Sequence, residues 1–77
     1  MRLLELQSGT FINTGMIVSA YISDSAEIEI IDGKQFKKKV IVIDTFKHDG
    51  DYIYFKSSDI NKINEKFNAL ISKLSEM

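Results

Sequence analysis

The chain has 77 residues, with ten basic and eleven acidic side chains, a net charge of -1 and no cysteine. A chain of this length forms one domain and buries only about 60–65% of its unfolded surface, so small domains add disulfides, a metal or a second chain. The lack of cysteine excludes disulfides and thiolate metal sites, and a single histidine argues against structural zinc. We therefore expect a homo-oligomer with no metal and no cofactor.

The near balance of charge is not that of an electrostatic nucleic-acid binder, although a local basic patch is compatible with it. No apolar run approaches the roughly 20 residues of a membrane span. The segment Met1–Leu6 carries an acid inside its apolar stretch, unlike a signal peptide. We expect a soluble, cytoplasmic protein that does not enter a membrane.

The N-terminal part of the chain predicts short β-strands joined by turns. Leu3–Gln7 and Thr10–Ile12 are brief strand candidates on either side of a Ser8-Gly9 turn. Asn13-Thr14-Gly15 then makes a second tight connection, because Asn and Gly are typical turn residues. Met16–Ser23 follows as a strand rich in β-branched and aromatic side chains.

After a break at Asp24-Ser25, residues 27–31 alternate acid with isoleucine, which is typical of a strand with one wet face. Asp32-Gly33 predicts a hairpin turn, and the return strand runs from Gln35 or Phe36 to Thr45 or Phe46. A two-residue turn pairs Ile30 with Gln35 and Glu29 with Phe36, whereas a three-residue loop pairs Ile30 with Phe36, Glu29 with Lys37 and Glu27 with Lys39. We favour the three-residue loop, since it sets apolar against apolar and acid against base, each pair being worth up to ~1 kcal/mol.

The return strand contains Val40-Ile41-Val42-Ile43, which is apolar on both faces. Either a partner subunit covers one of these faces, or the strand is central in the sheet and is reached from both sides. Asp49-Gly50 makes the next turn, and residues 52–55 form the last strand. Alternation places Ile53 and Phe55 in the core, with Tyr52 and Tyr54 on the outer face or in an interface, where tyrosine is enriched.

Residues 57–77 predict one amphipathic helix. Its apolar residues follow a three–four spacing at Ile60, Ile63, Phe67, Leu70, Leu74 and Met77, with Ile71 beside them. Ser57 or Ser58 is expected to cap the start, and Asp59 suits the positive helix end. We expect Ile60, Ile63, Phe67 and Leu70 to cover the sheet, and the edge formed by Ile71, Leu74 and Met77 to contact a partner chain.

Lys37-Lys38-Lys39 is the one dense charge run of the sequence. These lysines either contact phosphates of nucleic acid or nucleotide, or form a solvated strand that resists edge-to-edge aggregation and pairs with Glu27 and Glu29. We favour the second interpretation, because alternation sends Lys38 to the opposite face from its neighbours.

The segment His48-Asp49-Gly50-Asp51 places the lone histidine beside two carboxylates. One turn offers too few ligands for a metal, and Asp and Gly are what a hairpin turn requires. The sequence also shows no paired acid and base that would make His48 a catalytic group.

A Leu-rich strand, Ser8-Gly9, Phe11-Ile12-Asn13, an Asp32-Gly33-Lys34 hairpin and a Ser58-Asp59-Ile60 helix start follow one another in the chain. This order resembles a class of small bacterial and phage proteins that includes the FlbD-like proteins of flagellar operons. The resemblance covers about the first forty residues and the helix. It implies a small, non-enzymatic regulatory or interaction protein.

The sequence predicts a single α+β domain, in which a twisted antiparallel sheet of five or six short strands (residues 1–56) precedes one C-terminal helix (residues 57–77). We expect a non-catalytic, homo-oligomeric module that binds a protein partner, inhibitors encoded by phages or mobile elements being one setting. Nucleic-acid or nucleotide binding through Lys37, Lys38 and Lys39 is the alternative. The expected interface residues are Val40, Ile41, Val42, Ile43, Tyr52, Tyr54, Ile71, Leu74 and Met77.

Overall fold

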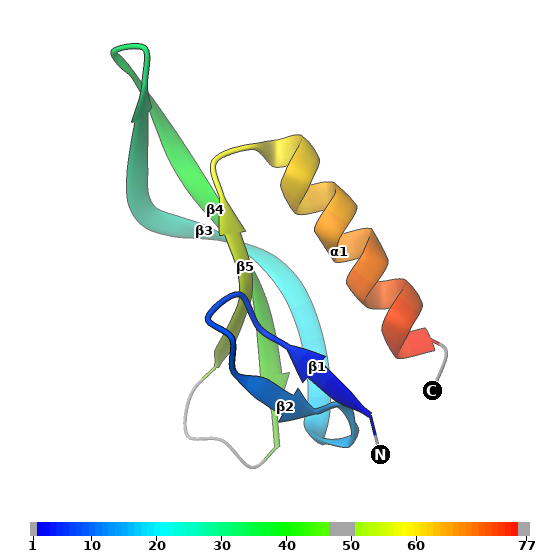
Figure 1. Cartoon of the computed structure of the whole chain (residues 1–77). Helices are drawn as coiled ribbons and strands as arrows, with labels where there is room; N and C mark the ends of the chain where they lie inside the picture. The colour runs from blue at the N-terminus through cyan, green and yellow to red at the C-terminus, as the bar shows by residue number, and fades with distance from the viewer. Residues whose placement is uncertain (1, 47–50, 76–77) are drawn as a thin grey trace.

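The structure is a computed structural model that describes residues 2–46 and 51–75. The elements in chain order are β1 (Leu3–Glu5), β2 (Phe11–Asn13), the 3₁₀ turn η1 (Thr14–Met16), β3 (Ile17–Ile31), β4 (Lys34–Thr45), β5 (Tyr52–Ser57) and α1 (Ile60–Ser75). β1 pairs with β2 in one antiparallel sheet, and a second antiparallel sheet has the order β3-β4-β5. The predicted α+β fold with a C-terminal helix is confirmed (Figure 1).

The strands are fewer than the six segments that the sequence marks, because two of these segments merge into β3. Asp24 pairs with Lys39 and Ile28 with Lys37, so residues 25–27 lie opposite the single residue Lys38. The predicted break at Asp24-Ser25 is therefore wrong. The extra residues are taken up by an irregular bulge, which bends the strand without taking it out of the sheet.

The turn between β3 and β4 is the two-residue kind, and the register that we favoured is wrong. Asp32 and Gly33 have φ angles of 52° and 77°, as a type I′ turn requires at both central positions. The observed pairs are Glu29 with Phe36, Ile30 with Gln35 and Ile31 with Lys34. A type I′ turn matches the twist of the two strands, and this geometry outweighs side-chain pairs that are worth less than ~1 kcal/mol each.

The core lies between the larger sheet and α1. Its buried residues come from the first hairpin, the central strand and the helix: Leu4, Leu6, Ile12, Ile41, Ile43, Ile63 and Leu70. Ile63 and Leu70 are seven residues apart, so they project from the same side of α1. Phe67 and Leu74 pack against this core from the same stripe. Ile60 was expected to join them, but it is exposed at the first residue of the helix.

Val40 and Val42 are also buried, on the opposite face of β4 from Ile41 and Ile43. Because β4 is the central strand, these valines lie between side chains of β3 and β5: Ser23 and Lys56 beside Val40, and Tyr21 and Ile53 beside Val42. The chain thus covers all four residues by itself. The predicted interface role of Val40–Ile43 is wrong, and the central-strand alternative is the one observed.

An irregularity in β5 changes which of its side chains face the helix. Ile41 pairs with Phe55 but Val42 pairs with Ile53, so Tyr54 is an extra residue in the ladder. As a result Tyr52, Tyr54 and Phe55 all pack against the core, while Ile53 is exposed. The expected alternation, with Ile53 inside and both tyrosines outside, is corrected by this bulge.

Asp59, rather than Ser57 or Ser58, caps α1. Its Oδ1 accepts hydrogen bonds from the backbone N–H groups of Asn61 (2.9 Å) and Lys62 (3.4 Å), as an N-cap side chain does. Ser57 Oγ accepts one from the backbone N–H of Asp59 at 3.0 Å and so fixes the turn before the cap. The helix therefore begins at Ile60, three residues after the predicted start.

The loop between β1 and β2 runs along the outer edge of β5. The backbone N–H of Gln7 donates to the carbonyl of Tyr54 at 3.1 Å, and Gln7 Oε1 accepts from the backbone N–H of Lys56 at 3.0 Å. These bonds satisfy polar groups that an edge strand otherwise leaves open. They also fix the first hairpin against the core that Leu4, Leu6 and Ile12 help to form.

Candidate interaction surface

The end of the β3–β4 hairpin extends past the rest of the sheet (Figure 1). Pairing between β4 and β5 ends where Lys39 meets Ser57, so within the described part of the chain β3 is the one strand that pairs with residues 34–38 of β4. We call residues 25–38 the hairpin arm. It contributes to an elongated molecule that measures 45 Å along its longest axis and 26 and 19 Å along the others.

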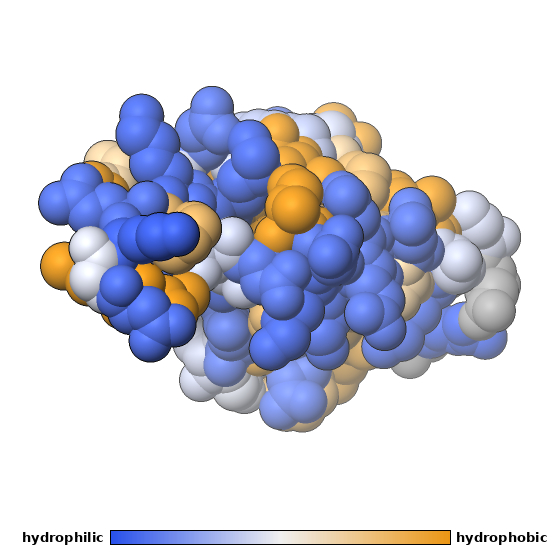
Figure 2. All heavy atoms as spheres, turned by 90° about the horizontal axis from the view of Figure 1, so that it is seen from above, coloured by the Kyte–Doolittle hydropathy of each residue, from blue (hydrophilic) through white to orange (hydrophobic). Residues whose placement is uncertain are grey.

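Four large apolar side chains of the arm are exposed. Ile28 and Ile30 project from one face of the ribbon and are 50% and 68% exposed, and Ile31 and Phe36 project from the other and are 44% and 42% exposed. Figure 2 shows hydrophobic atoms between hydrophilic ones over this end of the molecule, at the left of the view. Single exposed apolar residues are ordinary, but two exposed pairs on opposite faces of one short ribbon make the arm a candidate contact surface.

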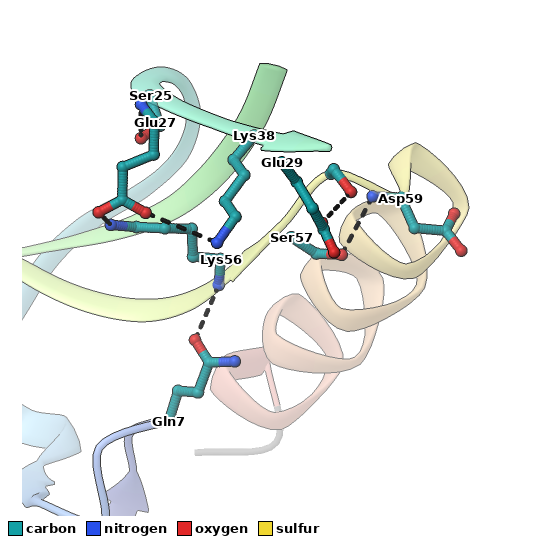
Figure 3. A network of polar contacts seen from close by, with 9 residues as sticks. Gln7, Ser25, Glu27, Glu29, Lys38, Lys56, Ser57 and Asp59 are labelled. Atoms are coloured by element: carbon teal, nitrogen blue, oxygen red, sulfur yellow. Dashed lines mark hydrogen bonds and ion pairs between the residues drawn. The ribbon is translucent and has the colours of Figure 1, made fainter. Parts of the chain in front are cut away.

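A polar network holds the base of the arm against the sheet and the start of the helix (Figure 3). Glu27 lies between Lys56 and Lys38, with nitrogen–oxygen distances of 3.1 and 3.7 Å. The hydroxyl of Ser58 donates a hydrogen bond to Glu29 Oε2. The hydrogen bond and charge of Lys56, with a smaller effect of Lys38, lower the pKa of Glu27. The network thus links the arm to both β5 and the β5–α1 connection.

The lysine run is largely engaged within the chain. Lys39 Nζ lies 2.6 Å from Asp24 Oδ1 and lowers the pKa of that carboxyl, and Lys38 pairs with Glu27. Lys37 lies opposite Ile28 and adds a weaker attraction to Asp24. The expected pairing of the lysines with acids of the other strand is therefore seen, but with Asp24 and Glu27 as the acids. Glu29 instead binds Ser58.

The other predicted interface residues fall into three groups. Tyr52, Tyr54 and Leu74 are partly buried and pack against the core, so only their uncovered parts are open to a partner. Ile71 is exposed on the helix, where the sequence placed it. Met77 lies outside the described residues, as do residues 48–50 of the predicted histidine turn.

One of two hollows that the described residues form beside β5 has a volume of about 420 Å³ and is lined in part by Glu5, Tyr54, Lys66 and Lys73. Lys66 Nζ lies 5.4 Å from the centre of the Phe55 ring, so this cation is already engaged with an aromatic face. Among residues 2–46 and 51–75, no three His, Cys, Asp or Glu side chains gather as a metal site would require. The hollow therefore offers no set of groups that points to a particular ligand.

Within the arm, the sequence marked only Lys37 and Lys38 as candidate site residues and did not predict its apolar surface. The alternation of Glu27–Ile31 indicated a strand with one buried face, whereas the structure leaves both faces of this ribbon exposed. One signal was present, since the segment 28–36 has four large apolar residues around a turn and no matching apolar strand to cover them.

No helix in the described parts of the chain is long and apolar enough to cross a membrane. Comparisons with family models, with curated proteins and with solved structures find no match to this chain. The resemblance to FlbD-like proteins thus stays a prediction from the sequence.

Proposed function

We propose that this chain is a non-catalytic, homo-oligomeric interaction module that binds a protein partner through the hairpin arm. The observation that carries the proposal is the exposure of Ile28, Ile30, Ile31 and Phe36 on an arm that projects from a completed core. A monomeric core that already buries Ile41, Ile43, Ile63 and Leu70 does not need these side chains. Their exposure costs solubility, and a partner that covers them would offset this cost.

The arm has a defined conformation, and this supports a role in binding. Its turn is a type I′ turn, and its base is fixed by Glu27 and Glu29 through contacts with Lys38, Lys56 and Ser58. A surface that is ordered before binding loses less conformational entropy when it meets its partner. The apolar side chains would form the dry centre of a contact, and polar neighbours such as Lys34 and Gln35 its rim.

Phosphate binding is the weaker candidate, because Lys38 and Lys39 already face carboxylates at 3.7 and 2.6 Å. A phosphate would have to displace Glu27 and Asp24 before it gained these contacts. Apolar protein contact through Ile30 and Phe36 requires no such exchange, since these side chains are already open to solvent.

The test compares capture of partners from a lysate of the source cells by three immobilised proteins. These are the wild type, the Ile30→Lys variant in the arm, and the Ile71→Lys variant on the exposed helix side as a matched control. Both replaced residues are exposed, so both variants should keep the circular dichroism spectrum of the wild type. We expect a protein enriched by the wild type and Ile71→Lys to be lost with Ile30→Lys. Equal capture by all three proteins would contradict the assignment of the arm.

A further inference from the structure

The outer edge of β3 is a second open surface, separate from the faces of the hairpin arm. Among residues 2–46 and 51–75, the sheet order β3-β4-β5 leaves β3 without a neighbouring strand on this side. The opposite edge of the sheet is covered, since Gln7 bonds to Tyr54 and Lys56 of β5. α1 packs on β4 and β5, so the helix leaves the β3 edge accessible.

Between its two register shifts, residues 19–23 of this edge lack the charges and the proline that keep an exposed strand from pairing. Residues 17–23 contain no charged residue and no proline, whereas exposed edges usually carry lysine, proline or inward charges. The part of β3 within the arm does carry charge, at Glu27 and Glu29. From Ser19 to Asp24 the ladder with β4 is regular, with register shifts only on either side. An unshifted, uncharged run, Ser19–Ser23, is thus available for backbone pairing.

The side chains of this run are complementary to the same run turned around. In an antiparallel pair with its two-fold axis at Tyr21, Ser19 faces Ser23, Ala20 faces Ile22, and Tyr21 faces its own copy. Hydroxyl and apolar pairs of these kinds stabilise a sheet; the Tyr21 hydroxyl is already bonded to Asp51 Oδ2 at 3.3 Å, so the pairing at Tyr21 rests on the backbone. Ala20 and Ile22 already pack against the core, so pairing would extend the apolar layer beneath the helix. On the other face, Tyr21 lies in one row with Val42 and Ile53, and pairing would double that row.

We infer that a second copy of this chain pairs antiparallel along the β3 edge, with Tyr21 at the two-fold axis, and forms a continuous six-stranded sheet. This inference rests on the homo-oligomeric part of the proposed function and is independent of the partner of the arm. It assigns the contact to Ser19–Ser23, a surface that none of the residues predicted from the sequence includes.

The test is a pair of double variants that differ only in the sign of one charge. In the proposed register Ser19→Lys lies opposite residue 23 of the other copy, so S19K/S23K brings like charges together and S19K/S23E brings opposite charges together. Light scattering after size exclusion, over about 5–500 µM protein, measures the dimer fraction. The wild type should reach twice the monomer mass of 8.8 kDa. We expect S19K/S23K to raise the dimer dissociation constant about tenfold or more, and S19K/S23E to restore it to within about threefold of the wild type.

Three outcomes would overturn the inference. The wild type could be monomeric over the whole concentration range. This would also be the result if the β3 edge pairs with an extended strand of another protein and not with a second copy. S19K/S23K could dimerise as well as the wild type, or S19K/S23E could fail to restore the dimer, which would refute the register at Tyr21. The Ile30→Lys variant of the arm should stay dimeric, so failure of the arm proposal and failure of this one give different results.

Discussion

Replacing Leu70 and its neighbour Ile71 one at a time by alanine tests whether a single chain completes its own core. The two residues are adjacent in α1, yet Leu70 is fully buried and Ile71 is 41% exposed. Each change removes three carbon groups, worth about 0.8 kcal/mol per group when fully buried. Leu70→Ala also leaves a cavity, so we expect it to lower the free energy of unfolding by about 2–5 kcal/mol. Ile71→Ala should lower it by only about 1 kcal/mol, because much of the side chain is already in water.

The assay is urea unfolding followed by circular dichroism, at a low and a high protein concentration. Native domains of this size have a total stability of roughly 4–12 kcal/mol, so Leu70→Ala should move the midpoint far more than Ile71→Ala at both concentrations. Equal losses would refute the burial of Leu70 and the exposure of Ile71 within a single chain. A loss for Ile71→Ala that grows with protein concentration would instead place Ile71 in a subunit contact, as the sequence suggested.

Three further changes test local features of the fold. Asp59→Ala should cost about 1 kcal/mol of unfolding free energy by removing the helix cap, and Asp59→Asn should restore most of it. Gly33→Ala should cost about 1–2 kcal/mol from the left-handed backbone alone, since a Cβ at Gly33 meets no atom within 4 Å. The pKa of Glu27 is lowered from 4.5 in the fold, so its ion pairs stabilise above about pH 4.5 and are lost as the pH falls through the folded pKa. Glu27→Gln should therefore flatten the dependence of Tm on pH in acid; an unchanged slope would exclude a role for Glu27.

The three–four spacing of apolar residues predicted which side of the C-terminal helix is buried. Ile63, Phe67 and Leu70 contact the sheet as their spacing indicated, because a helix presents residues three and four apart to the same side. The helix start was displaced because Ser57, Ser58 and Asp59 are all good caps. Which of them takes the role depends on where β5 ends and on the contact between Ser58 and Glu29.

The features that the sequence did not reveal are the ones that depend on register. The extra residue at Tyr54 reverses the expected sides of Tyr52 and Ile53, and no composition signal marks a bulge. The arm arises because β5 pairs with β4 only as far as Lys39, a length set by three-dimensional pairing rather than by either strand alone. The run Val40–Ile43, apolar on both faces, left open whether a partner subunit or the sheet itself covers it, and burial of both faces of a central strand decides for the sheet.

Site-specific photo-crosslinking in the source cells tests whether the arm is the surface that binds a partner. A photoreactive phenylalanine analogue replaces Ile30 in one strain and Ile71 in another, both being exposed positions on an otherwise unchanged fold. We predict that position 30 crosslinks to a discrete partner protein under ultraviolet light and that position 71 does not. A crosslinked species from position 71 alone, or none from position 30, would contradict the proposed role of the arm.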